Sequence, residues 1–336
     1  MSTNTSGINT NPRPPIVDTI QLRNIQLSLP AAPDPWHRSA YPQSCTATLK
    51  LSYASSEASA ETDDVGLTID YGKLYRSFAK DLGRLGKETD AGALISNGER
   101  VVNLDGVRLE DVLRGAMGED VRLTAGIIAN CCLQQLDETA VSYLPSPRFL
   151  DISSHRITSN ASPPAVEKDF GRFQIRLAFP KAILRADGGL QYRCVTELGH
   201  LESEAKEQSQ RRLVVLVEEF RIVQIRSYCI LGINPHERLE KQAVFTTLRF
   251  QGPGLQEWST KFIDNYQEMT RVVAERVEAT SFGSVEALAT LIARIVTMEF
   301  GHEEVTVLVQ KPSALGFVEG AGLECTRSRA YFEKRS

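Results

Sequence analysis

The sequence of 336 residues contains no apolar run close to the roughly 20 residues that a membrane-spanning helix needs. Its opening segment, MSTNTSGINTNPRPP, lacks both the apolar core of a secretory signal and the arginine-rich pattern of a transit peptide. We therefore expect residues 1–15 to form a disordered polar tail. We also expect a cytoplasmic protein with no membrane partner.

The sequence also has no excess of positive charge. It contains 38 Lys and Arg and 42 Asp and Glu, which gives a net charge of -4. Such a surface repels a phosphate backbone and offers no polybasic patch to anionic lipids, so we expect no nucleic-acid partner. The 6 cysteines include no CxxC pair, and the 5 histidines show no metal-ligand spacing. Hydrophobic residues make up 42% of the chain, which is typical of a soluble globular protein.

The second half of the sequence has the clearest periodicity. Its expected strands are 213–230, 243–250, 305–311 and 317–327. Asp264 with Gln267 resembles a capping box, which predicts that a helix opens there. A second helix is expected from Val285, so the order is strand, strand, helix, helix, strand, strand.

The first half repeats this order, with extra length in two insertions that are rich in turn-forming residues. Asp70-Tyr71 opens its first helix, and Val121–Ala129 aligns without a gap with Val285–Ala293 of the second half. The expected domain boundaries are unit 16–197 with insertions near 85–118 and 138–170, linker 198–211, and unit 212–330. The predicted fold class is therefore α+β, with two tandem ββααββ units.

Each predicted unit is an antiparallel sheet with its helices on one face. Open sheet edges favour pairing with another edge. We therefore expect edge-to-edge assembly within the chain and between chains, giving a barrel in a homo-oligomer of two or four chains.

Four motifs of the second unit resemble the dihydroneopterin aldolase family, and together they span nearly all of residues 212–330. They are Gly232-Ile233-Asn234-Pro235-His236-Glu237-Arg238, with Gln242 following, then Asp264-Asn265-Tyr266, Ser284-Val285-Glu286 and Lys311-Pro312. The resemblance implies the tunnelling fold and retro-aldol cleavage of 7,8-dihydroneopterin. The products would be 6-hydroxymethyl-7,8-dihydropterin and glycolaldehyde, on the route to folate. It also implies neither a metal nor a lysine Schiff base, and no cofactor.

The resemblance assigns a role to each motif. Glu286, with Val285 beside it, would bind the pterin, because one carboxylate can accept bonds from an amino group and a ring N–H together. Lys311 would be the base or proton relay, since a partly desolvated lysine gives up its proton more readily. Glu237 would hold the side-chain hydroxyls of the substrate and a water molecule.

A tyrosine would return a proton to the carbon that is released. Both Tyr71 and Tyr266 stand where the family's tyrosine does, and that residue reaches the site from a neighbouring subunit. The sequence leaves open whether Tyr71, or Tyr266 of another chain, completes the site of the second unit.

The first unit departs from the family pattern at three positions. His37 stands where Glu237 does, Arg122 where Glu286 does, and Phe179 where Lys311 does. Arginine offers no acceptor and phenylalanine carries no proton, so we expect this unit to be inactive as an aldolase. A different alignment, with Leu109-Glu110 at the helix start, would restore a carboxylate.

Two other functions fit the sequence less well. A pterin-binding protein without turnover is the main alternative, because the first unit is degenerate and its insertions could reshape the junction. A zinc-dependent tunnelling-fold enzyme is the second, and the isolated histidines argue against it.

Overall fold

The computed structural model describes residues 8–10, 12–30, 32–36, 38, 41–55, 58–83, 103–104, 107–108, 120–141, 166–201 and 211–334. The main strands of the first half are β2 (Val17–Leu29), β3 (Gln43–Ser55), β6 (Val166–Phe179) and β7 (Ala186–Leu201). Its helices are α2 (Tyr71–Leu82) and α5 (Val121–Val141). Its short elements are β1 (Ile8–Thr10), α1 (Ala58–Thr62), η1 (Val65–Leu67), β4 (Asn103–Leu104) and β5 (Val107–Arg108).

The second half begins with the longest strand, β8. Its main strands are β8 (Arg211–Leu231), β9 (Gln242–Pro253), β11 (Glu304–Lys311) and β12 (Ala321–Ser328). Its helices are α6 (Glu257–Glu278), α7 (Val285–Arg294), the π-helical turn η3 (Ile295–Glu299) and α8 (Arg329–Glu333). The turn η2 (Pro235–Arg238) follows β8, and the short strand β10 (Ser281–Phe282) precedes α7.

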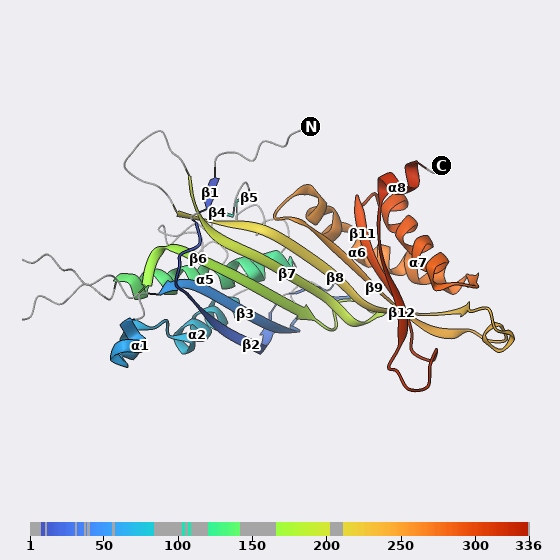
Figure 1. Cartoon of the computed structure of the whole chain (residues 1–336), viewed down its shortest axis with the longest axis horizontal. Helices are drawn as coiled ribbons and strands as arrows, with labels where there is room; N and C mark the ends of the chain where they lie inside the picture. Colours follow the sequence, from blue (N-terminus) through green and yellow to red (C-terminus); the bar gives the residue numbers. More distant parts are fainter. Residues whose placement is uncertain are drawn as a thin grey trace, which may run out of the picture.

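One sheet runs through both halves (Figure 1), in the order β12-β11-β9-β8-β7-β6-β3-β2. The halves meet where β7 pairs antiparallel with β8, from Ala186 opposite Ile225 to His200 opposite Arg211. This is the edge-to-edge contact expected within the chain. Because the path ends at β2 and β12, the described strands of one chain form an open sheet and not a closed barrel.

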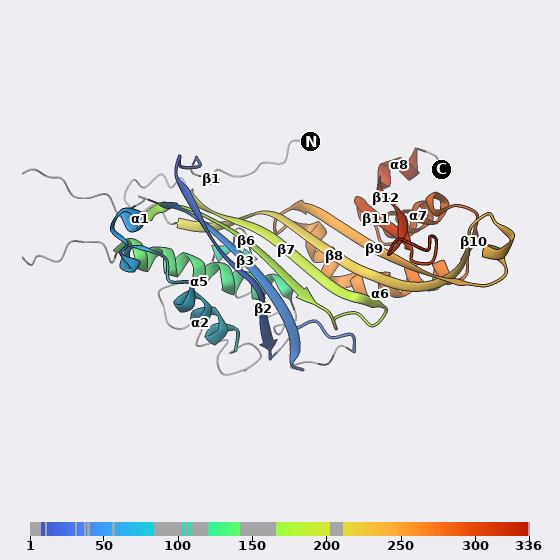
Figure 2. The same ribbon diagram turned by 60° about the horizontal axis from the view of Figure 1, so that its bottom comes forward.

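The helices cover one face of this sheet (Figure 2), with α2 and α5 under the first half and α6 under the second. Along the strands, buried side chains alternate with partly exposed ones, as in β3 and β9. Such alternation places apolar side chains under the helices and polar ones on the opposite face. No helix in the described part of the chain combines the length and the apolar content needed to cross a membrane.

The same β-bulge occurs in the first strand of each half. Asn24 in β2 and Gln224 in β8 adopt positive φ angles of 54° and 59°. The ladder registers shift around them, which frees one backbone N–H in each strand. That N–H donates to a threonine hydroxyl of the next strand, Thr48 at 3.3 Å and Thr247 at 3.1 Å.

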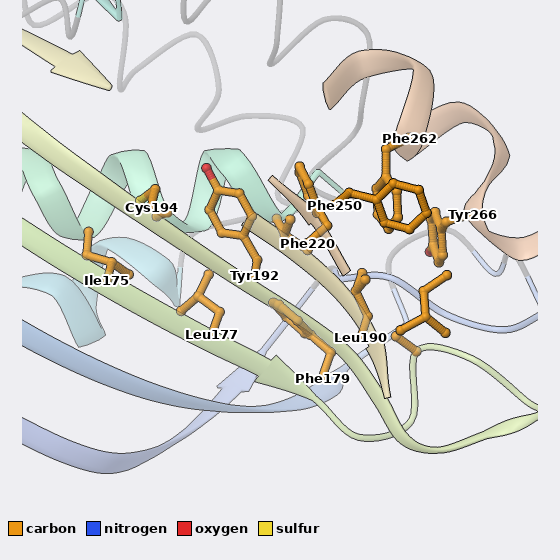
Figure 3. Close-up of a cluster of buried hydrophobic side chains, with 14 of the residues drawn as sticks. Ile175, Leu177, Phe179, Leu190, Tyr192, Cys194, Phe220, Phe250, Phe262 and Tyr266 are labelled. Atoms are coloured by element: carbon orange, nitrogen blue, oxygen red, sulfur yellow. The ribbon is translucent and has the colours of Figure 1, made fainter. Parts of the chain in front are cut away.

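An aromatic cluster fills the core where the two halves join (Figure 3). Phe220 of β8 stacks on Phe262 of α6 at a centroid distance of 4.5 Å and contacts Tyr192 of β7 at 4.9 Å. Phe250 of β9 packs on Phe262 at 5.0 Å. Because aromatic side chains bury the most apolar area, this cluster fixes α6 over the β7–β8 seam.

The start of α6 differs from the prediction. The helix begins at Glu257, after Gln256, and not at Asp264. The chain leaves β9 at Gly252-Pro253-Gly254, and burial of Phe262 between two aromatic rings favours helix from that break onward. Asp264 and Gln267 are therefore interior positions, and their capping-box pattern is coincidental.

Several expected boundaries fall next to described elements. β1 lies in the expected tail and pairs with β7. β7 continues to Leu201 and β8 begins at Arg211, so strand residues occupy both ends of the expected linker. The last strand begins at Ala321, later than expected, because residues 312–320 form an exposed turn. The insertions at 85–118 and 138–170 lie largely outside the described residues.

Candidate active site at the end of β8 and β11

Lys311, the last residue of β11, is a buried lysine with two partners. It follows Val305, Val307 and Val309 on the helix-covered face and is only 6% exposed. Its Nζ donates to Oε1 of Glu237 at 2.7 Å and to the carbonyl of Leu231 at 2.8 Å. The alternation of β11 therefore places an amine on the helix-covered face at the end of the strand, where polar groups of the loop after β8 meet it.

The turn η2 presents the Glu237 carboxylate to this amine. The second carboxylate oxygen of Glu237, Oε2, accepts from the backbone N–H of Asn234 at 3.0 Å and from the Asn234 side-chain amide at 2.9 Å. The Lys311 hydrogen bond, aided by that backbone N–H, lowers the pKa of the Glu237 carboxyl to about 2. Glu237 is thus an anion held from both sides.

Gly232 makes this close approach possible. Its φ of 141° lies in a region that side chains rarely adopt, and a Cβ there would come within 2.3 Å of the Glu237 carboxyl group. Two further side chains fix the turn: Gln242 donates to the Leu231 carbonyl at 2.6 Å, and Arg238 to the Ser281 hydroxyl at 2.6 Å.

The first turn of α7 begins beside the same strand end. β10 pairs with Ile230 and Leu231 of β8, and Ser284 then caps α7 by accepting from the Ala287 N–H at 3.2 Å. Val285 is half-buried, whereas Glu286 is exposed and makes no hydrogen bond within the described part of the chain. The helix N-terminus favours its negative charge. The fold thus brings the elements that carry Glu286, Glu237 and Lys311 to one end of the sheet.

The two candidate tyrosines lie elsewhere. Tyr266 is 8% exposed in the interior of α6, where it stacks on Phe262, and its hydroxyl accepts from Gln267 at 3.2 Å. Tyr71 is 64% exposed at the start of α2, after its cap Asp70. α2 lies at the end of the sheet opposite β11 and β12 (Figure 1), so Tyr71 of the same chain does not reach Lys311.

The first half has a cavity of about 550 Å³ at the corresponding strand ends, between the loop after β2 and the β6–β7 turn. There a buried carboxylate, Asp34, accepts from Arg38 and Gln43, each at 2.7 Å. The Arg38 hydrogen bond lowers the pKa of Asp34 to about 2. Asp34 therefore braces its own loop, and buried Phe179 stands where Lys311 does.

Arg122 also has a structural role at its position in α5. Its guanidinium binds Asp120 at 2.6 Å and reaches the hydroxyls of Ser259 at 3.3 Å and Thr260 at 3.1 Å, in the first turn of α6. His37 and Leu109-Glu110 lie outside the described residues. Among the residues that the structure describes, no three His, Cys, Asp or Glu side chains lie close enough together to hold a metal ion.

Two site residues went unrecognised in the sequence. Asn234 and Gly232 belong to the quoted loop motif, yet their support of Glu237 was not predicted. The signal was present, because an Asn-Pro pair with Glu three positions after the Asn is a capping-box pattern.

The fold and site define an antiparallel α+β domain with a carboxylate–amine pair at the ends of its strands. Residues 220–326 match the family model described as FolB: Dihydroneopterin aldolase, and this stretch is a domain of that family. The match does not extend over the first half.

Curated relatives agree with this assignment. The folic acid synthesis protein fol1 of Pneumocystis carinii is 35% identical over 148 residues, 42% of this chain and 20% of that protein. The protein of the same name from Schizosaccharomyces pombe is 27% identical over 168 residues, 50% of this chain and 20% of that protein. The matched part of the chain thus spans about a fifth of the length of these relatives.

Among solved structures, E. coli dihydroneopterin aldolase in complex with neopterin aligns with 33% of this chain and 98% of its own. The sequence identity is 18% and the TM-score 0.30. The sequence match to the family, not this structural likeness, carries the assignment.

Proposed function

We propose that the second half of the chain is a dihydroneopterin aldolase. It would cleave 7,8-dihydroneopterin into 6-hydroxymethyl-7,8-dihydropterin and glycolaldehyde, in folate synthesis. The observation that carries this proposal is the buried Lys311 amine, 2.7 Å from the Glu237 carboxylate at the end of β11. A proton-transfer pair of this kind suits a reaction that removes one proton and returns another.

In this proposal Glu286 anchors the substrate. Its carboxylate, which makes no hydrogen bond within the described residues, accepts from the amino group and ring N–H of the pterin, and Val285 lines the pterin site. Glu237 holds the side-chain hydroxyls and a water molecule. Lys311 relays the hydroxyl proton, the carbon–carbon bond breaks, and the pterin ring takes up the electron pair until the carbon is protonated.

The phenol that protonates this carbon is proposed to be Tyr71 of a second copy. Tyr71 is exposed at a helix start, whereas Tyr266 is packed in the core. We expect Tyr71→Phe to slow turnover. Mixed oligomers of Tyr71→Phe and Lys311→Met chains should regain activity, because one site then holds both intact residues. Failure of the mixture to recover would assign the phenol to Tyr266 or to another group.

We also propose that the chain is a tandem of two tunnelling-fold units, 16–197 and 212–330, joined by the linker 198–211. The repeated bulge at Asn24 and Gln224, each held by a threonine hydroxyl, supports a duplication. The main elements follow the same order in both halves, which is strand, strand, helix, helix, strand, strand.

The test of the activity is direct. Purified full-length protein is incubated with 7,8-dihydroneopterin, and the products are identified by mass. Release of glycolaldehyde and 6-hydroxymethyl-7,8-dihydropterin is the expected result, and intact substrate after prolonged incubation would overturn the proposal.

A pterin-binding protein without turnover is the second candidate. The observation in its favour is that neither candidate tyrosine of the chain lies beside Lys311. Saturable binding of a pterin without glycolaldehyde release by the assembled oligomer would support it.

A further inference from the structure

The sheet face opposite the helices carries a line of arginines. Four adjacent strands contribute one each, and we call them the arginine belt: Arg176 (β6), Arg193 (β7), Arg221 (β8) and Arg249 (β9). Each is flanked along its strand by two buried side chains, as Arg176 is by Ile175 and Leu177. Since successive strand residues point to opposite faces, the arginines project away from the helix-covered core.

The strand register places these positive charges next to one another. Arg176 lies directly opposite Arg193, and Arg221 directly opposite Arg249. Residues paired in this way have Cβ atoms about 5 Å apart, and like charges directly opposite destabilise a sheet. The net charge of the chain is -4, so the belt does not reflect a generally basic protein.

One carboxylate in the described part of the chain pairs with the belt. Glu219, opposite Arg193, is 6% exposed and accepts from Nε of Arg221 at 2.8 Å. Arg249 reaches only the Thr306 hydroxyl, at 3.5 Å. Within the described residues, Arg176, Arg193 and Arg249 therefore form no ion pair, although Glu219 lies opposite Arg193 in the ladder.

We propose that the arginine belt binds a chain of linked phosphates, as in inorganic tripolyphosphate or a nucleoside triphosphate. A guanidinium presents a planar fork of donors that fits phosphate oxygens, and a bound anion removes the repulsion within both arginine pairs. With strands about 4.8 Å apart, the belt extends roughly 14 Å across the sheet. That shape suits a row of phosphates better than a single anion.

The belt is separate from the proposed aldolase site. Lys311 belongs to the helix-covered face of β11, whereas the belt occupies the opposite face. Loss of phosphate binding and loss of aldolase activity can therefore be told apart by measuring both in each variant.

Calorimetric titration of the full chain with sodium tripolyphosphate tests the inference. We expect saturable binding that weakens as salt is added, because screening reduces the attraction. The Arg176→Gln/Arg193→Gln double variant should bind at least about tenfold more weakly, the factor expected for one lost charge-assisted hydrogen bond. Arg294→Gln, which removes one positive charge at the end of α7 and outside the belt, should bind like the wild type. No saturable binding, or equal affinity in the double variant, would overturn it.

Thermal unfolding gives a second readout that a merely structural role would not reproduce. Without anion, the double variant should unfold at a higher temperature than the wild type, because the repulsion is gone. Tripolyphosphate should raise the unfolding temperature of the wild type more than that of the variant. A variant that is less stable and equally protected by tripolyphosphate would contradict the proposal.

Comparison of several anions identifies which chemical group the arginine belt recognises. Orthophosphate at equal concentration should bind more weakly than tripolyphosphate. Equal affinity for ATP and tripolyphosphate means that the phosphates alone are recognised, and tighter ATP binding means that a nucleoside is also contacted. An oligoglutamate peptide that binds as tightly as tripolyphosphate would show that the belt does not select phosphate.

Discussion

Lys311 shows how one residue joins the fold to the proposed chemistry. Apolar residues occupy the preceding helix-facing positions of β11, so a lysine at the strand end is buried along its stem while its amine meets polar groups. The Leu231 carbonyl and the Glu237 carboxylate hold that amine at the end of β11.

Replacement of this amine should abolish the proposed turnover and preserve the fold. Lys311→Met keeps the apolar stem and removes the proton carrier, so we expect kcat for dihydroneopterin cleavage to fall roughly 10²–10⁴-fold. Lys241→Met, in the exposed loop near Gln242, is the matched control and should retain activity. Circular dichroism checks the fold, and an unchanged kcat in Lys311→Met would remove Lys311 from the mechanism.

Ionisation of the Glu237 carboxyl should make the stability of the fold depend on pH in the acid range. Its pKa falls from the ordinary 4.5 to about 2, because the folded state favours the anion through Lys311 and Asn234. A carboxyl whose pKa is lower in the folded state than in the unfolded state stabilises the protein at pH values above the unfolded-state pKa. This stabilisation is lost as the pH falls through the folded-state pKa. The difference in unfolding temperature between wild type and Glu237→Gln should thus be full at pH 6 and vanish between pH 4.5 and 2.

The exposed loop acid Glu240 provides the control for this titration. Glu240→Gln should change the unfolding temperature little at any pH. If the difference for Glu237→Gln were flat across the same range, the ion pair with Lys311 would not be present in solution.

Among the elements, α6 depends on a buried polar network at its start. Glu218 of β8 accepts from the backbone N–H of Leu255 at 2.6 Å and from the Tyr192 hydroxyl of β7 at 2.7 Å. Burial raises the pKa of the Glu218 carboxyl above its ordinary value. Arg122 adds hydrogen bonds to the first turn of α6, so α5, α6 and the β7–β8 seam are fastened together.

Removal of one hydroxyl from this network should weaken the whole fold. Tyr192→Phe keeps the ring in the aromatic cluster but leaves the buried Glu218 short of one hydrogen bond, which costs about 1–3 kcal/mol. Urea unfolding monitored by circular dichroism measures the loss. Tyr75→Phe, at an exposed position of α2, should stay within about 0.5 kcal/mol of wild type. Equal stability of the two variants would show that Glu218 gains nothing from Tyr192.

The elements were largely predictable from the sequence, because alternation and apolar stripes express local burial. Strands β8 and β9 and the Asp70 cap of α2 follow the prediction closely. The start of α6 does not, because the tertiary burial of Phe262 outweighs a local capping pattern. The bulge at Gln224 also escaped prediction, since its hydrogen bond goes to a threonine on the next strand, which the local sequence does not indicate.

The part of the candidate site that the family motifs cover was predictable from the sequence. The part that depends on side-chain packing was not. Lys311 and Glu237 lie in motifs at the ends of β11 and β8, which both pair with β9. The burial of Tyr266 depends on the length of α6, and the bracing role of Asp34 depends on a loop whose partners are distant in sequence.

At the scale of the molecule, the two edge strands of the sheet leave apolar side chains partly exposed. Ile20, Leu22 and Ile25 on β2, and Leu323 and Cys325 on β12, pack against the core yet are only partly buried. Exposed edges of this kind invite another strand. Since one chain carries both edges, β2 of one copy can pair with β12 of another, which would complete apolar burial on both edges.

We therefore expect the wild-type chain to be a dimer or tetramer and Leu323→Lys to be a monomer, with light scattering after size exclusion as the measurement. A charge on the core-facing side of β12 opposes strand addition, whereas β12 keeps its ladder to β11 within the chain. Leu315→Lys, in the exposed turn before β12, is the control and should keep the wild-type mass. Because the proposed site takes Tyr71 from a second copy, the Leu323→Lys monomer should also lose turnover. A fully active monomer would show that one chain suffices, and an unchanged mass would move the interface to another surface.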